Sequence, residues 1–330
     1  MNGHTLGRRH FLKTLTAIGA AGSIAPAFGS SLVWAPDKKV DKADKAVNTA
    51  YDPKAKLEIT VSEVEMRRNS AGRMLMARIY QPKGAGPFPT VLDLHGGAWN
   101  AKDRHAEEPM DRSLASSGLL VVAIDMTLAH EAPYPACVQD GNYGVRWLKS
   151  KAATWNGDPL KLGLYGSSSG GQVAELLVMR PHDPRYNAIP LATEPNVDAT
   201  VAYAAMRSPV SDPLARFNNA KKHNREEMMK NHTTFFVPWD TIHESNPQEI
   251  LDRHEKINLA PLLIMAGALD DNVLPEIQER FVASYKAAGG EVQFQIFEGA
   301  EHEWVANEGP QTDRARAMVK AFIARQLRKF

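Results

Sequence analysis

A Gly-x-Ser-x-Gly turn within Gly166–Gly170 constrains this chain more than any other feature. An apolar run with strand character ends at the turn, and a helical pattern follows over residues 172–179. A strand that reverses into a helix within one residue brings neighbouring backbones so close that only glycine fits two positions to either side of the apex. Ser168 has both glycines, whereas Ser167 and Ser169 do not. The pattern therefore predicts a strained turn that projects the Ser168 hydroxyl above a sheet.

Strand-like and helix-like segments alternate along the rest of the chain. The expected strands are residues 57–61, 74–80, 90–94, 119–124, 161–165, 199–203, 261–266 and 291–297, and the expected helices are 135–151, 172–179 and a C-terminal one from about 313. The first two strands alternate apolar and polar residues around a turn, which predicts an antiparallel pair. The later strands are apolar throughout, as in parallel strands buried on both faces. The pattern predicts an α/β fold with a mostly parallel central sheet and helices on both faces.

Residues 207–258 interrupt this alternation with a polar, helical and irregular stretch. Its position between two expected strands predicts a lid insertion over the catalytic edge of the sheet. Its aromatic residues concentrate around Phe235 and Trp239, and Trp99 is a candidate on the opposite side. These three side chains are expected either to wall a small substrate pocket or to pin the lid to the sheet.

Composition excludes several classes of function. The 330 residues carry a net charge of only +1, which argues against a nucleic-acid partner. A single cysteine, Cys137, excludes an internal disulfide, and the chain has neither a C-x-x-C nor an H-E-x-x-H motif. We therefore expect no metal and no cofactor.

The N-terminal region predicts export. Residues 1–27 contain Arg8-Arg9, a mild apolar run and a closing A-x-A, as in a bacterial twin-arginine signal peptide. The apolar run is too short for stable membrane insertion. Residues 28–56 alternate charge and read as a tether, which leaves 57–330 as the catalytic domain. The predicted location is the periplasm or the exterior of the cell.

A nucleophilic serine needs a base and a group that orients the base. Asp270 follows the expected strand 261–266 and can reach over the carboxyl edge of the sheet, with Asp271 as its rival. His302 lies in the loop after the last expected strand, and His130, which precedes the serine, is its rival. Ser168, Asp270 and His302 follow one another in the order that serine hydrolases with this turn use.

The oxyanion of the reaction needs backbone N–H donors. Candidates are the N–H of Ser169 and those within His95–Trp99, where two glycines follow an expected strand. Glycines let backbone amides turn toward a developing negative charge, although a Gly-Gly pair after a strand is also common in simple turns.

These motifs together resemble those of carboxylesterases with the α/β-hydrolase fold, in the hormone-sensitive-lipase-like and bacterial feruloyl or acetyl-xylan esterase-like groups. His95-Gly-Gly-Ala-Trp99 is similar to their H-G-G-[GA]-W, Leu128–Ala136 to their L-A-P-E-x-x-x-P-A, and Gly166–Gly171 to their G-S-S-A-G-G. The resemblance covers about 57–327 outside the insertion. It implies Gly97, Ala98 and Ser169 as oxyanion donors. His130 and Thr127 depart from the pattern, where the family usually has Pro and Arg.

The sequence therefore predicts an exported serine esterase that cleaves short-chain or aryl esters through an acyl-enzyme on Ser168. Two alternatives remain open at this point. One is an amide or formamide hydrolase, since the turn at His95–Trp99 also resembles that of kynurenine formamidase. The other is a catalytically silent binding protein with the same fold. The expected partner is a small-molecule ester.

Overall fold

The computed structural model describes residues 51–330, which form one compact unit. The predictions for the signal peptide at 1–27 and for the tether up to residue 50 lie outside the described residues. Within the described part of the chain, no helix is long and apolar enough to cross a membrane.

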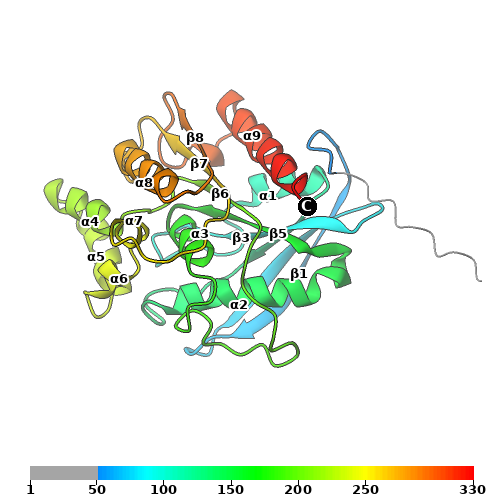
Figure 1. Ribbon diagram of the computed structural model, residues 1–330, viewed down its shortest axis with the longest axis horizontal. Helices are drawn as coiled ribbons and strands as arrows, with labels where there is room; N and C mark the ends of the chain where they lie inside the picture. The colour runs from blue at the N-terminus through cyan, green and yellow to red at the C-terminus, as the bar shows by residue number, and fades with distance from the viewer. Residues whose placement is uncertain (1–50) are drawn as a thin grey trace, which may run out of the picture. The chain divides into compact units, whose positions relative to one another are not determined.

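A single sheet of eight strands forms the centre of the molecule (Figure 1). The strands are β1 (Ile59–Arg68), β2 (Met74–Pro82), β3 (Phe88–Leu94), β4 (Leu120–Ile124), β5 (Gly157–Ser167), β6 (Ala204–Arg207), β7 (Leu262–Gly267) and β8 (Val292–Phe297). Their order across the sheet is β1-β2-β4-β3-β5-β6-β7-β8. β2 pairs antiparallel with β1 and with β4, and every later pair is parallel.

Helices cover both faces of this sheet (Figure 1). One face packs against α2 (Ala136–Lys151), α3 (Ser168–Met179) and α8 (Pro275–Ala287), and the other against α1 (Glu108–Ser116) and α9 (Pro310–Leu327). Neighbouring strand residues alternate between the two cores: Leu92 belongs to the first and Val91 to the second. Two short 3-10 turns, Ala152–Trp155 and Trp304–Ala306, complete the regular structure outside the insertion. This architecture confirms the predicted α/β-hydrolase fold.

One strand lies later in the sequence than predicted. The prediction put it at 199–203, but β6 is Ala204–Arg207. Ala202 N and Tyr203 O do bond to the neighbouring β5, whereas the pairing with β7 begins only at Ala204. The segment before Ala204 therefore has a partner on one side only.

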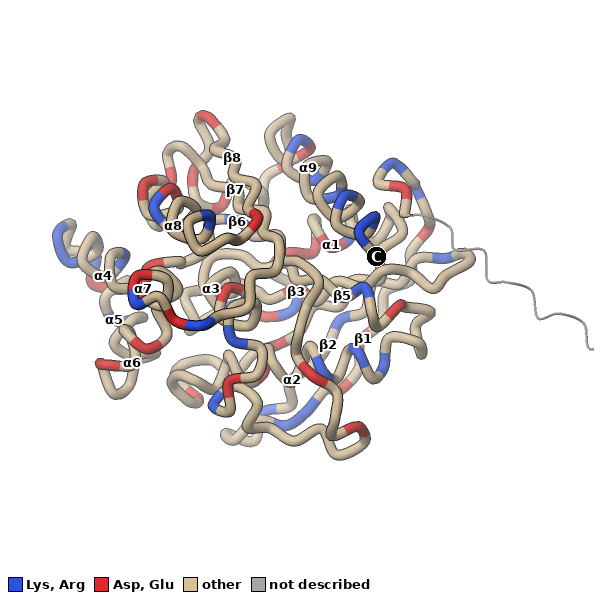
Figure 2. The backbone as a smooth tube through the Cα atoms, in the orientation of Figure 1, with Lys and Arg blue, Asp and Glu red and all other residues tan. Residues whose placement is uncertain are grey.

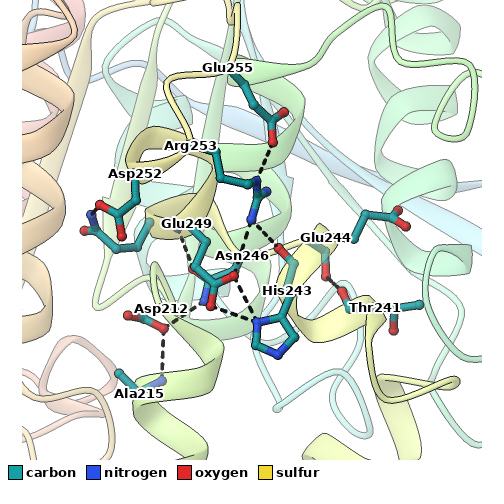
Figure 3. A network of polar contacts seen from close by, with 12 residues as sticks. Asp212, Ala215, Thr241, His243, Glu244, Asn246, Glu249, Asp252, Arg253 and Glu255 are labelled. Carbon is teal, nitrogen blue, oxygen red and sulfur yellow. Dashed lines mark hydrogen bonds and ion pairs between the residues drawn. The ribbon is translucent and has the colours of Figure 1, made fainter.

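The insertion between β6 and β7 contains four helices, α4 (Pro213–Lys222), α5 (Glu226–Phe235), α6 (Thr241–Glu244) and α7 (Pro247–Asp252). Asp212 caps α4 by accepting a hydrogen bond from Ala215 N, and Asn246 caps α7 by accepting one from Glu249 N. Asn246 Nδ2 also donates to Asp212 Oδ1 at 2.8 Å, so the two caps are linked (Figure 3). This network ties α4 to α7.

Candidate active site

Ser168 stands at the sharp turn between β5 and α3. Its φ of 51° lies in the left-handed region, which is strained for a residue with a side chain. A Cβ at Gly166 would lie 2.8 Å from Gly170 O, and one at Gly170 would lie 2.0 Å from Leu94 O. Both glycines are therefore required by close backbone approach, as the sequence motif predicts.

The structure brings Ser168, His302 and Asp270 together at the carboxyl edge of the sheet. His302 Nε2 lies 3.0 Å from Ser168 Oγ, and His302 Nδ1 lies 2.8 Å from Asp270 Oδ2. All three residues are buried, with 5%, 8% and 2% of their surfaces exposed for Ser168, His302 and Asp270. With Nδ1–H donating to the carboxylate, Nε2 is the acceptor for the serine hydroxyl.

Asp270 is held in place by its own loop. Its Oδ1 accepts hydrogen bonds from Val273 N at 2.8 Å and from Asn272 N at 3.0 Å. Burial opposes ionisation, but the hydrogen bond and the charge of His302 lower the pKa of Asp270 below its usual value. The carboxylate is therefore the stable form next to the imidazole.

The two rival residues lie elsewhere. The side chain of Asp271 is largely exposed and pairs with Arg225, with 2.7 Å between Oδ2 and Nη2. His130 is exposed in the turn after β4. Neither contacts Ser168, so the structure favours Asp270 and His302 over them.

The predicted oxyanion donors lie beside the serine, on a loop with unusual backbone geometry. Gly97, Ala98 and Trp99 have φ values of 100°, 51° and 62°. A Cβ at Gly97 would lie 2.1 Å from Ala101 O, which requires glycine there. Within residues 51–330, the N–H groups of Gly97 and Ala98 have no hydrogen-bond acceptor. The N–H of Ser169, in the first turn of α3, is likewise free of intrahelical bonding.

Two side chains hold this loop in place, Ser169 from the nucleophile turn and His95 from within the loop itself. Trp99 N donates to Ser169 Oγ at 3.1 Å, a contact that no sequence pattern predicts. His95 Nδ1 donates to Gly96 O at 2.8 Å, and His95 Nε2 accepts from Met126 N. Burial lowers the pKa of His95, which keeps the imidazole neutral in this bridging role.

A buried ion pair lies beneath the triad, and sequence reasoning missed it. Arg207, at the end of β6, donates to Glu107 Oε1 at 3.1 Å and to His302 O at 2.5 Å. Ser167 Oγ donates to the same Glu107 oxygen at 2.6 Å. The pair thus connects the loop of His302 to the residue before Ser168. A charged residue at the end of an apolar strand was the signal that could have revealed it.

The aromatic residues proposed for a substrate pocket take part in packing, Phe235 against Trp99 of the loop after β3 and Trp239 within the insertion. Trp99 and Phe235 stack with ring centroids 4.7 Å apart, and only 4% and 1% of their surfaces are exposed. Trp239 is half-buried against Phe217, 4.7 Å away between centroids. The second of the two expectations, that these rings pin the insertion, is the one that agrees with this arrangement.

Two hollows in the surface lie beside the proposed catalytic residues and oxyanion loop. One of about 420 Å³ is lined by Ala98 and by residues of α4 and α5, and one of about 360 Å³ is lined by His302 and the loop of Asp270. Most of their lining side chains are polar or charged. Among residues 51–330, no group of His, Cys, Asp or Glu is arranged to hold a metal ion.

Comparisons with known proteins place this chain in a family. The family model described as BD-FAE matches residues 78–284. An AB hydrolase superfamily protein of Schizosaccharomyces pombe is 28% identical over 249 residues, which cover 70% of this chain and 68% of that protein. The carboxylesterase NlhH of Mycobacterium tuberculosis is 32% identical over 108 residues, which cover 32% of this chain. The matched stretch spans only 34% of the length of NlhH.

Solved structures agree on the fold. Esterase B from a Lactobacillus superposes with a TM-score of 0.69 at 18% identity, covering 84% of this chain and 88% of the other. A propionate-bound esterase of Thermogutta terrifontis superposes with a TM-score of 0.63 at 21% identity, covering 82% and 94%. The chain therefore belongs to the BD-FAE family and is an α/β-hydrolase of the carboxylesterase type.

Proposed function

We propose that this protein hydrolyses small carboxylic esters through an acyl-enzyme on Ser168. The observation that carries the proposal is the chain of hydrogen bonds from Ser168 Oγ to His302 Nε2 and from His302 Nδ1 to Asp270. The free N–H groups of Gly97, Ala98 and Ser169 support it, because they supply donors where an oxyanion would form.

The first half of the reaction forms the acyl-enzyme. Ser168 Oγ attacks the ester carbonyl carbon while His302 Nε2 takes the hydroxyl proton. The carbonyl electron pair moves to oxygen, and the resulting oxyanion accepts hydrogen bonds from the three backbone N–H groups. His302 then donates its proton to the departing alcohol as the C–O bond breaks. Asp270 stabilises the imidazolium and fixes its tautomer throughout.

The second half releases the acid. Water replaces the alcohol, His302 Nε2 removes a proton from it, and the hydroxide attacks the acyl carbon. The second tetrahedral intermediate collapses with expulsion of Ser168 Oγ, which recovers its proton from His302. The products are one carboxylic acid and one alcohol.

The substrate proposal favours short acyl groups. The aromatic side chains of the insertion are engaged in packing, and the hollows beside Ala98 and His302 are mostly polar. The Thermogutta esterase, described with propionate and with butyrate bound, also supports this choice. An added methylene contributes only about 0.8 kcal/mol, and only where apolar space receives it.

The experiment is a p-nitrophenyl ester series at equal, sub-micellar concentrations, with wild type and Ser168→Ala. We expect kcat/KM to fall from acetate to palmitate and Ser168→Ala to be inactive on every ester. Faster turnover of palmitate would overturn the short-chain proposal, and an active Ser168→Ala variant would overturn the mechanism. Matched p-nitroanilides test the amide alternative.

We also propose that the protein is exported, which rests on Arg8-Arg9, the apolar run and the A-x-A within residues 1–27. Replacing both arginines by lysine should leave the full-length chain in the cytoplasm of a bacterial host. Unchanged appearance in the periplasmic fraction would contradict export by the twin-arginine route.

A further inference from the structure

Arg216, on helix α4, is a buried guanidinium beside the oxyanion loop. Only 2% of its surface is exposed, yet it lines the 420 Å³ hollow together with Ala98. Its Cζ lies 5.8 Å from the centre of the Trp99 ring, which stands next to Ala98 in the chain. The side chain therefore reaches from the insertion to the loop that carries the proposed oxyanion donors.

The partners of Arg216 are all neutral. Nε and Nη2 donate to Asn272 Oδ1 at 3.0 and 2.7 Å, and Nη1 lies 3.4 Å from His232 Nε2. His232 Nδ1 donates to Met228 O at 2.7 Å, which leaves Nε2 as an acceptor. Burial and the neighbouring Arg216 lower the pKa of His232 to about 3, so this imidazole is uncharged at neutral pH.

Within residues 51–330 no carboxylate forms an ion pair with Arg216, although the charge of Asp270 acts on it from beyond ion-pair distance. Burial lowers its pKa only to about 10, so the guanidinium stays protonated at neutral pH. Arg207 and Arg225 pair directly with Glu107 and Asp271, but no carboxylate among the described residues pairs with Arg216. Burying a cation without an anionic partner is costly, which makes a bound anion favourable there.

The guanidinium of Arg216 also has N–H donors that are not used by these contacts. It carries five N–H groups, and the three contacts above use three of them. Asn272 lines both the 420 Å³ and the 360 Å³ hollows, and its N–H holds Asp270, so Arg216 is anchored to the loop that orients the catalytic imidazole. Figure 2 shows further Lys and Arg positions at the α4 end of the insertion. Glu226 and Glu227 also line the hollow, but both are exposed to solvent, which screens their charges.

The geometry points to Arg216 as the binding group for a carboxylate carried by the substrate itself. The preferred substrates are then small esters with an anionic carboxylate near the scissile bond, rather than uniformly neutral esters. This inference rests on the proposed esterase function and adds the substrate class to it. Carboxylate oxygens accept hydrogen bonds from a guanidinium more strongly than neutral amide oxygens do.

The test compares pairs of substrates that differ only in this charge. One pair is 4-acetoxybenzoate and 4-acetoxybenzamide, which place the group on the alcohol side. The other is the mono-p-nitrophenyl ester of glutaric acid and the corresponding glutaramic ester, which place it on the acyl side. Because each pair is compared within one variant, an effect of Arg216 on the nearby Asp270 cancels in the ratio of kcat/KM values.

For wild type we expect kcat/KM to favour the carboxylate by about ten-fold or more in at least one pair. Arg216→Gln should bring that ratio close to one, and Arg216→Lys should retain part of it. Lys221→Gln, which removes an exposed charge from the same helix, should leave the ratio unchanged.

A ratio near one in wild type for both pairs, with the neutral esters cleaved well, would overturn the carboxylate subsite and leave the esterase proposal standing. Equal loss on both members of a pair in Arg216→Gln would also overturn it, since that is the result of a purely structural role. Failure of wild type on every ester would instead refute the proposed function.

Discussion

Replacing Arg207 by methionine should destabilise the protein strongly, because Arg207 is the cationic partner of a buried acid. It is 2% exposed and pairs with Glu107. Burial lowers the pKa of its guanidinium, but the neighbouring Glu107 and Tyr165 outweigh burial and leave the pKa raised. Removing one member of a buried ion pair leaves the other charge uncompensated, at a cost of about 3–5 kcal/mol in the free energy of unfolding. For a domain of this size that loss lowers the Tm by roughly 10 °C.

The neighbourhood of Glu107 adds to this cost. Asp93 and Asp111 are buried close to it, and among residues 51–330 their carboxyl oxygens have no hydrogen-bond partner. Burial first, and then the charges of neighbouring acids, raise the pKa values of Asp93 and Asp111 well above their usual range. Arg207 offsets the charge of Glu107 and Asp93, and Arg78 acts on Asp111, so the loss of Arg207 leaves Glu107 without its direct partner.

The assay is urea unfolding followed by circular dichroism, with two companion variants. The double variant Arg207→Met/Glu107→Gln should recover much of the lost stability, because the amide is uncharged and still accepts from Ser167. Lys83→Met, which breaks an exposed pair with Glu58, should leave the unfolding midpoint nearly unchanged. An Arg207→Met variant as stable as wild type, or a double variant no more stable than the single one, would refute this reasoning.

Two further predictions concern pH. The pKa of Asp111 is raised in the folded protein, so its contribution to stability is complete below the unfolded-state pKa of about 3.9 and is lost as pH rises through the folded-state pKa. In urea unfolding, Asp111→Asn should therefore raise the free energy of unfolding more at a pH of about 8 than at a pH of about 5. An identical effect at both pH values would contradict the assignment. The lowered pKa of Asp270 keeps its carboxylate charged, so Asp270 should add no ionisation of its own to the acid limb of ester hydrolysis, which should have a slope of one; an acid limb of slope two in kcat/KM would contradict this.

The fold and the three central residues could be predicted because their signals are local. A glycine two positions to either side of Ser168 indicates that neighbouring backbones approach closely. A carboxylate just after a parallel strand indicates a side chain at the carboxyl edge of the sheet. Choosing Asp270 over Asp271 depended on spacing alone, and the structure shows why the neighbour differs: its side chain points to solvent and Arg225.

What the sequence did not reveal depends on contacts between distant segments. Glu107 and Arg207 are one hundred residues apart in the sequence. They meet because Arg207 ends β6, β6 lies next to β5, and Glu107 contacts Ser167 at the end of β5. The aromatic residues of the insertion were ambiguous for the same reason: a ring beside a site and a ring that pins a helix look alike until their burial is known. Arg216 was visible only as one charge among several on a polar stretch.

Covalent labelling with paraoxon tests the central claim most directly. A structural neighbour, the Thermogutta esterase, is described as phosphorylated by this compound. In this chain Ser168 Oγ should attack phosphorus and expel p-nitrophenolate, leaving a diethylphosphoryl group that peptide mass spectrometry locates. We predict a single modification, on Ser168, that is absent in Ser168→Ala and much slower in His302→Gln. Stoichiometric modification of another residue, or labelling that persists in Ser168→Ala, would contradict the assignment of Ser168 as the nucleophile.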